Sequence, residues 1–247
     1  MSSTLQMIMG VGVAAVIAST ASASINVDYL GLGYGKSQSV SYNSTVQWNQ
    51  AGSGPFYSLS AFDHHWVDTD TNQQFIGWCI QLYQGITIGN AYTFDVVALE
   101  NAPQAPLAPG PMGVLQAGLM RDLFARWADT APGTIVPEAN LANTNSKAAA
   151  FALAIWEISH ENFTAVDLGT LKSQMSLTLG GLRVNATADV LAYYNAMHAS
   201  LGVGGWLYAD VDGLVNSSAQ DQARLVPAPG ALALIGLAGL FGARRRK

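Results

Sequence analysis

Cysteine is the scarcest residue of this sequence, with Cys79 as the one cysteine among 247 residues. This excludes an intramolecular disulfide framework. We expect the thiol to be buried, because free cysteine is among the most buried residue types. Charged residues are also few, at 11%, whereas 50% of the residues are hydrophobic. A chain of this length and composition can bury a full core, so we expect one main domain between removable ends.

Basic residues are outnumbered by acidic ones. The chain has 11 Lys and Arg against 16 Asp and Glu, and four of the basic residues stand together at Arg244–Lys247. The body before this tail therefore carries seven basic against sixteen acidic side chains, a net charge of −9. An acidic body argues against nucleic acid as a partner.

Several enzyme signatures are absent. The sequence has no Gly-x-Ser-x-Gly elbow, no Walker loop, no dinucleotide fingerprint and no His-Glu-x-x-His motif. The polar residues Asp63, His64 and His65 do have side chains that can ligate a metal or transfer protons. A secreted hydrolase that uses these three residues is therefore the alternative to a non-enzymatic function.

The residues that follow imitate the opening of a calcium-binding loop. Asp68-x-Asp70-x-Asn72 has the required spacing, but Gln73 stands where such a loop needs glycine. Asp and Asn are also common in turns. We therefore interpret residues 63–74 as a solvated turn before a buried strand, and we expect no metal site and no cofactor.

The segment from Lys147 to Glu161 is predicted to be the core helix. Its residues from Ala148 to Trp156 are all apolar and rich in strong helix formers. A helix that is apolar on every side must be buried, so we expect Phe151, Ile155 and Trp156 to pack in the core.

Charge returns at the end of this helix with Glu157, His160 and Glu161. Two acids beside a histidine have the side chains that acid–base catalysis uses. The same composition is typical of a helix end that emerges into water. We adopt this second interpretation and assign no catalytic residue.

The remaining pattern predicts an α+β fold. Alternating apolar and polar residues, with breaks at Gly, Ser and Asn, indicate strands and no helix between Ile25 and Phe62. We expect further strands at Phe75–Tyr83, Tyr92–Leu99 and Trp206–Val211, a strand pair or hairpin within Leu177–Val184, and two more helices at Met112–Trp127 and Thr187–Leu201. Together they predict an N-terminal antiparallel sandwich-like or barrel-like portion, a small helical subdomain and a return strand.

The N-terminus has the layout of a signal peptide. The apolar run Met7–Ile17 is followed by small residues, and Ala21-x-Ala23 is the pattern that a signal peptidase cleaves. We predict that residues 1–23 are removed on export and that the mature chain begins at Ser24.

The C-terminus combines three elements. The motif residues Pro227, Pro229 and Gly230 precede twelve apolar residues, and the basic residues Arg244, Arg245, Arg246 and Lys247 follow. Twelve helical residues span about 18 Å, short of the roughly 30 Å hydrocarbon core of a bilayer. This layout favours a sorting signal with a short transmembrane helix rather than a permanent membrane span.

This C-terminal segment resembles the PEP-CTERM sorting domain, although Ala228 stands where that family most often has glutamate. The resemblance implies an exported protein of a Gram-negative bacterium, anchored transiently in the inner membrane and processed near Pro227–Gly230 by an exosortase-type enzyme. It also implies an association with exopolysaccharide and biofilm. On this basis we divide the chain into a signal peptide at 1–23, a body at 24–222 and a sorting signal at 223–247.

The body has a second resemblance, carried by the strand Phe75-Ile-Gly-Trp-Cys79, the core helix, and Gln220-Asp-Gln222. These segments are similar to exported PEP-CTERM proteins and to thioester-forming surface adhesin domains. In those domains a cysteine on a strand bonds to a glutamine of the core helix, three residues before an Ile-Trp pair.

The position of that glutamine corresponds to Ala152, which has no acyl group to offer Cys79. We therefore expect no working thioester. The favoured function is that of a structural or adhesive cell-surface or matrix protein, whose ligand would be an extracellular polysaccharide or another cell-surface molecule.

Overall fold

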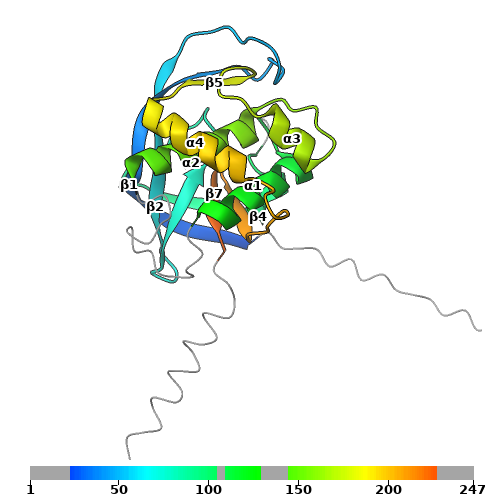
Figure 1. Ribbon diagram of the computed structural model, residues 1–247. Coiled ribbons are helices and arrows are strands. Elements are labelled where there is room, and N and C mark those ends of the chain that lie inside the picture. The colour runs from blue at the N-terminus through cyan, green and yellow to red at the C-terminus, as the bar shows by residue number, and fades with distance from the viewer. Residues whose placement is uncertain (1–22, 105–108, 129–143, 227–247) are drawn as a thin grey trace, which may run out of the picture.

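The computed structural model describes residues 23–104, 109–128 and 144–226. The predicted α+β class is confirmed, with a mixed fold built on an antiparallel sheet (Figure 1). The strands are β1 (Ala23–Tyr42), β2 (Tyr57–Asp68), β3 (Gln74–Cys79), β4 (Ala91–Ala98), β5 (Leu182–Asn185), β6 (Val211–Val215) and β7 (Gln222–Leu225). The helices are α1 (Gly113–Trp127), α2 (Asn145–His160), α3 (Leu168–Gln174), α4 (Ala188–Ser200) and the 3-10 turn η1 (Leu99–Asn101).

Six of the strands close into a ring in the order β1-β2-β3-β7-β6-β4, because β1 pairs with both β2 and β4. Val27 shows this double pairing, with Asp68 on one side and Tyr92 on the other. β5 pairs with the end of β1, where Val40 faces Val184. A closed ring leaves few unpaired strand edges.

The β portion is not confined to the N-terminal half. β6 and β7 come from the C-terminal end of the body, and they complete the ring between β3 and β4. The expectation of an N-terminal β portion joined by one return strand is therefore wrong in this respect, since two C-terminal strands belong to the ring. The sequence could not show this, because nothing in the alternation of a strand indicates which partner it pairs with.

β1 continues across the glycine-rich segment where the sequence predicted a break. Its pairing with β2 shifts register between Tyr29 and Gly31 and again between Leu32 and Gly35. A Cβ at Gly35 would lie 2.4 Å from the Ala61 carbonyl oxygen. Glycine therefore lets the two strands approach each other and bend without ending the strand.

Several predicted strands are shorter or displaced. β3 ends at Cys79 rather than at Tyr83. The expected strand pair at Leu177–Val184 is a single strand, β5, which pairs with β1. The return strand expected at Trp206–Val211 begins only at Val211, and the residues before it form an irregular loop.

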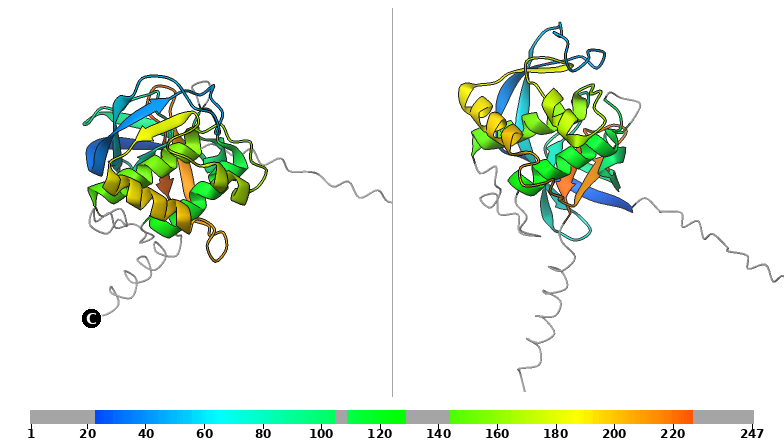
Figure 2. Two further views of the ribbon diagram at one scale, coloured as in Figure 1. Left: turned by 45° about the horizontal axis from the view of Figure 1, so that its top comes forward. Right: turned by 45° about the vertical axis from the view of Figure 1, so that its right-hand side comes forward.

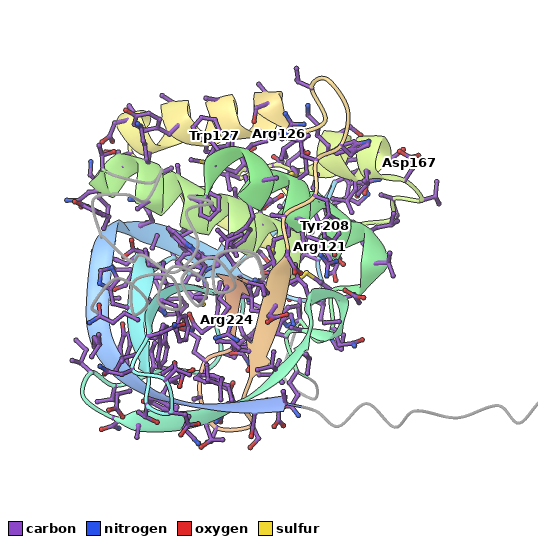
Figure 3. The ribbon with its side chains drawn as sticks, turned by 90° about the horizontal axis from the view of Figure 1, so that it is seen from below. Arg121, Arg126, Trp127, Asp167, Tyr208 and Arg224 are labelled. Carbon is purple, nitrogen blue, oxygen red and sulfur yellow. The ribbon has the colours of Figure 1, made fainter. Side chains whose placement is uncertain are left out.

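The predicted core helix is confirmed as α2. Every residue from Ala148 to His160 is buried, including Phe151, Ile155 and Trp156. The Thr144 hydroxyl caps the helix by accepting a hydrogen bond from the Lys147 amide at 3.2 Å. Figures 2 and 3 show the helices gathered in one layer against the strands, so α2 lies inside the molecule.

The buried hydrophobic residues form two clusters. The larger one joins α1, α2 and α4 to the sheet, and Phe151 touches Phe124 of α1 and Trp78 of β3. The smaller one consists of Ile25, Val27, Tyr29, Trp66, Phe94, Leu214 and Ala219. Its three β1 residues alternate along the strand and so share one face with which Trp66 and Phe94 pack, and this inner cluster fills the ring. Among the residues that the structure describes, no helix is long and apolar enough to cross a membrane.

Candidate functional site

Cys79 lies at the end of β3 and points toward the inside of the ring. The preceding residue, Trp78, points the opposite way and packs on Phe151 of α2, with ring centroids 4.7 Å apart. Cys79 is buried and faces Gln222 in the β3–β7 register. Its thiol donates a hydrogen bond to the Gln81 carbonyl at 3.1 Å.

This environment holds the thiol in its neutral form. Burial raises the pKa of Cys79 to about 12, and contacts with the Gln81 backbone and the Trp156 indole oppose the shift only in part. Trp156 Nε1 has no hydrogen-bond partner in the described part of the chain, so its contact with the sulfur is weak. Nucleophilic cysteines have a lowered pKa. The local chemistry therefore disfavours attack by Cys79 at neutral pH.

Ala152 lies one helical turn before Trp156, on the same side of α2. It is buried in the cluster that also contains Cys79. The thioester resemblance assigns the acyl donor to this helix position. In the structure, the position lies on the side of α2 where Trp156 contacts Cys79. The side chain there is a methyl group, which cannot be an acyl donor.

Amide groups are present near the thiol but are already hydrogen-bonded. Gln222 Oε1 accepts a hydrogen bond from His64 Nδ1 at 2.9 Å, and Gln222 Nε2 donates to the Gln220 carbonyl at 3.1 Å. Gln81 Oε1 accepts from the Gln84 amide at 2.9 Å. These bonds stabilise the ends of β3 and β7 and keep both carboxamides in place.

A cavity of about 290 Å³ opens beside this group of residues. Leu59, Leu82 and Ile86 line it with apolar side chains, and His64 and Trp156 reach it from the ring and from α2. Its size is near the lower end of ligand pockets.

The three residues of the hydrolase alternative do not meet in one site. Asp63, His64 and His65 belong to β2, where neighbouring side chains point to opposite faces. His64 faces Gln222 inside the ring, and burial lowers its pKa to about 4. His65 Nε2 instead lies 3.3 Å from the Asp63 carboxylate on the other face.

The interpretation of residues 63–74 as a solvated turn is wrong for its first half. Asp63 and His64 are buried in β2. The turn begins only after Asp68, whose carboxylate accepts hydrogen bonds from the amides of Asp70 and Thr71. The described residues contain no group of three or more His, Cys, Asp or Glu that could hold a metal ion.

The end of the core helix is also buried, contrary to the prediction that it emerges into water. Glu157 accepts a hydrogen bond from the Ser176 amide, and Glu161 accepts from the amides of Gly181 and Leu182. Burial raises the pKa of both carboxyl groups.

His160 links this helix end to the segment that follows β3. Its Nε2 accepts a hydrogen bond from the Leu82 amide at 3.1 Å, and burial lowers its pKa to about 3. A neutral imidazole that accepts through one nitrogen can donate through the other, and Nδ1 lies 3.2 Å from the Trp156 carbonyl. Together the three polar residues fix loops rather than form a reaction centre.

One surface feature was missed by the sequence-based interpretation. The loop from Val203 to Tyr208, which we call the aromatic loop, exposes Val203 (64%), Trp206 (42%), Leu207 (47%) and Tyr208 (72%). The signal available in the sequence was the glycine cluster Gly202-x-Gly204-Gly205 directly before two aromatic residues. It was interpreted as a helix end and a strand.

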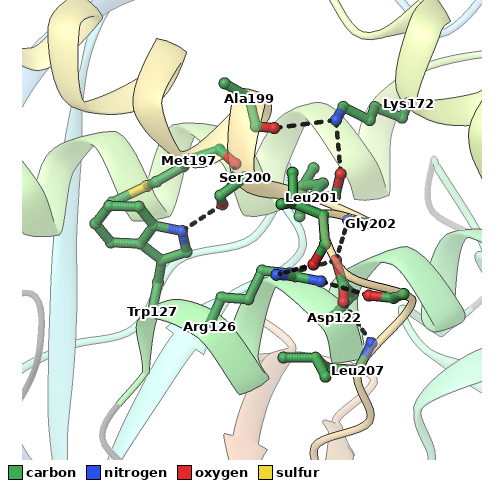
Figure 4. Close-up of polar contacts among 12 residues, drawn as sticks. Asp122, Arg126, Trp127, Lys172, Met197, Ala199, Ser200, Leu201, Gly202 and Leu207 are labelled. Carbon is green, nitrogen blue, oxygen red and sulfur yellow. Dashed lines mark hydrogen bonds and ion pairs between the residues drawn. The ribbon is translucent and has the colours of Figure 1, made fainter.

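A buried ion pair holds this loop in place (Figure 4). The Asp122 carboxylate accepts hydrogen bonds from the amides of Gly202 at 2.9 Å and Leu207 at 2.6 Å. It also pairs with Arg126 Nε at 2.9 Å. Arg126 in turn donates to the carbonyls of Val203 and Gly205. The loop therefore has a fixed backbone although its apolar side chains face water.

Comparison of the chain with protein-family models, with curated proteins and with solved structures found no match.

Proposed function

We propose that this chain is an exported protein, sorted by an exosortase-type enzyme to the cell surface or extracellular matrix of a Gram-negative bacterium. In this role it is a structural or adhesive component associated with exopolysaccharide and biofilm. It works without a thioester.

The position of the folded body between the two terminal signals carries the proposal. The first strand begins at Ala23, where the predicted signal peptide ends, and the last strand ends at Leu225, just before Pro227. The described ring is closed by strands that lie between these two points of the chain. β7 extends into the segment 223–247 as far as Leu225. The two signals themselves lie outside the described residues, apart from Ala23 and Ala223–Val226.

The chemistry of the body supports a non-catalytic role. Cys79 is buried and neutral, its helix neighbour Ala152 has no acyl group, and the Asp63–His65 pair faces away from His64. What the body exposes instead is the aromatic loop. A rigid domain with an exposed apolar loop is suited to attachment.

Expression in a native host, followed by fractionation and N-terminal sequencing, tests the sorting. We expect a mature chain that begins at Ser24 outside the inner membrane. Deletion of residues 227–247 should release the body to the medium, and deletion of residues 2–23 should retain it in the cytoplasm as a matched control. A full-length, uncleaved wild-type chain in the cytoplasm would overturn the proposal.

A further inference from the structure

The aromatic loop lies next to the point where the chain leaves the fold toward its C-terminus. Leu225 pairs with Val211, and the Val226 amide donates a hydrogen bond to the Asp210 carbonyl at 2.9 Å. Asp210 is only two residues from Tyr208, a chain distance of at most about 7 Å. The start of the tail and the aromatic loop therefore share one edge of the molecule.

The tail leaves little room between the body and a membrane. Only the four residues Pro227–Gly230 separate Val226 from the apolar run that begins at Ala231. Fully extended, they span at most about 14 Å. The headgroup region on one side of a bilayer is roughly 5 to 8 Å thick. Once the apolar run is inserted, the edge that contains Val226 is held within about 10 Å of the headgroups.

The loop has the side chains that suit this position. Trp and Tyr concentrate at membrane interfaces, because their rings combine an apolar body with a polar group. The backbone is fixed by Asp122 and Arg126, so the rings are already exposed and lose little conformational freedom on insertion. Trp206 packs on Gly202, where an added Cβ would lie 2.9 Å from its ring.

The charges around the loop exclude simple electrostatic adsorption. Arg121, which stacks on Tyr208 with its guanidinium carbon 5.2 Å from the ring centroid, is paired with Glu100 at 3.0 Å (Figure 3). Arg126 is paired with Asp122. The body as a whole is acidic and would be repelled by anionic lipid. Contact with a membrane must therefore depend on the apolar side chains and on the high local concentration that the tail creates.

We propose that the aromatic loop inserts into the interface of the bilayer that holds the C-terminal segment. Val203, Trp206, Leu207 and Tyr208 then lie at the boundary between the headgroups and the acyl chains. This inference rests on the proposed sorting function. It gives the body a fixed orientation while it is anchored. It also keeps Pro227–Gly230 at the membrane surface, where a membrane-embedded processing enzyme can reach it.

The full-length chain in phosphatidylcholine vesicles, with acyl chains brominated near the headgroup, tests this contact. Bromine quenches tryptophan only at close range, and Trp206 is one of six tryptophans, so we expect loss of about one sixth of the emission. Trp206→Phe should abolish the quenching. Trp48→Phe is the matched control and should leave the quenching unchanged. Trp48 belongs to the connection between β1 and β2, and this segment projects at the top of Figure 1, away from the end of β7.

A second pair of variants tests insertion without altering the fluorophore. Val203→Asp places a charge in the interface at an exposed position and should reduce the quenching at least twofold. Val166→Asp is its control, at an exposed position next to α3. If the chain floats with the vesicles but Trp206→Phe leaves the quenching intact, the loop inference is wrong and anchoring stands. If the chain does not float with the vesicles, the anchoring itself is overturned.

Discussion

The inside of the ring and the aromatic loop invert the usual relation between residue type and exposure. The ring encloses groups that could be reactive, namely Cys79, His64 and Gln222, and burial keeps them neutral or hydrogen-bonded. The loop exposes apolar side chains and uses a buried carboxylate, Asp122, to hold them in water. The difference supports the proposal that the interior stabilises the fold and that the aromatic loop makes contacts.

The largest expected change in the free energy of unfolding is for a buried tryptophan, and an exposed tryptophan provides the comparison. Trp156→Ala should lower the free energy of unfolding by roughly 3 to 5 kcal/mol, because it empties the space between α2 and the ring. Trp206→Ala, in the aromatic loop, should cost roughly 1 kcal/mol, since its ring is partly exposed. Urea unfolding of both variants measures the difference. Equal effects would contradict the division between a stabilising interior and a contact loop.

Removal of the Asp122 carboxylate should have the second-largest effect on the free energy of unfolding. Asp122→Ala leaves Arg126 and two loop amides without their acceptor, and we expect a loss of roughly 2 to 4 kcal/mol. The loop should also become a preferred site of chymotrypsin cleavage at Trp206 or Tyr208. Asp95→Ala, which removes an exposed carboxylate of β4, is the control and should change neither measurement. An uncleaved loop in Asp122→Ala would show that the ion pair does not hold it.

The histidine inside the ring predicts a pH dependence with a definite sign. The pKa of His64 is lowered to about 4 in the folded state, against about 6.5 in the unfolded chain. The unfolded state therefore binds more protons between these values, and stability is lost as pH falls below about 6.5. For His64 alone the loss is roughly 2 kcal/mol at pH 5.

Buried acids act in the opposite direction, so a variant must isolate the histidine. Burial raises the pKa of Asp221 from 3.8 to about 6, so the folded state loses stability as pH rises between these two values. His64→Gln keeps a polar side chain opposite Gln222 but cannot titrate. The stability difference between wild type and His64→Gln should shrink from pH 7 to pH 5 in urea titrations. A difference independent of pH would mean that His64 does not remain neutral inside the ring.

The smallest effect concerns the mass of the protein. Wild type should retain the ammonia, about 17 Da, that thioester formation would release, and its thiol should react slowly with alkylating reagents. If the resemblance to thioester domains extends to their geometry, some Ala152→Gln protein should lose this ammonia and become reactive to small amines. Ala150→Gln, on the opposite side of α2, should not. Wild-type protein that already lacks 17 Da would show that another amide, such as Gln81 or Gln222, is the acyl donor.

The outcome for the core helix shows which features a local pattern can predict. Nine consecutive apolar residues that are rich in strong helix formers favour a buried helix, so the position of α2 followed from the sequence. The same holds for α1 and α4 and for the alternating strands, because their periods are set by local backbone geometry. The burial of Cys79 was also predicted, from residue type alone.

The polar residues were predicted less well because their environment depends on distant segments. Asp63 and Glu157 have side chains typical of exposed positions, yet both are buried. Glu157 is satisfied by the Ser176 amide and Glu161 by the Gly181 amide, contacts that no local pattern contains. Likewise, the Gly-rich segment before Trp206 is an irregular loop because Asp122 and Arg126, about eighty residues earlier, bond its backbone groups.

The α+β class, the buried core helix and the acidic charge of the body can be derived from the amino-acid sequence, because each depends on composition or on a short period along the chain. The closure of the ring by β6 and β7, the contact of His64 with Gln222 and the position of the aromatic loop beside the end of β7 follow from the folded structure. These relations join residues far apart in the sequence. Their free energy comes from contacts that exist only after the chain has folded.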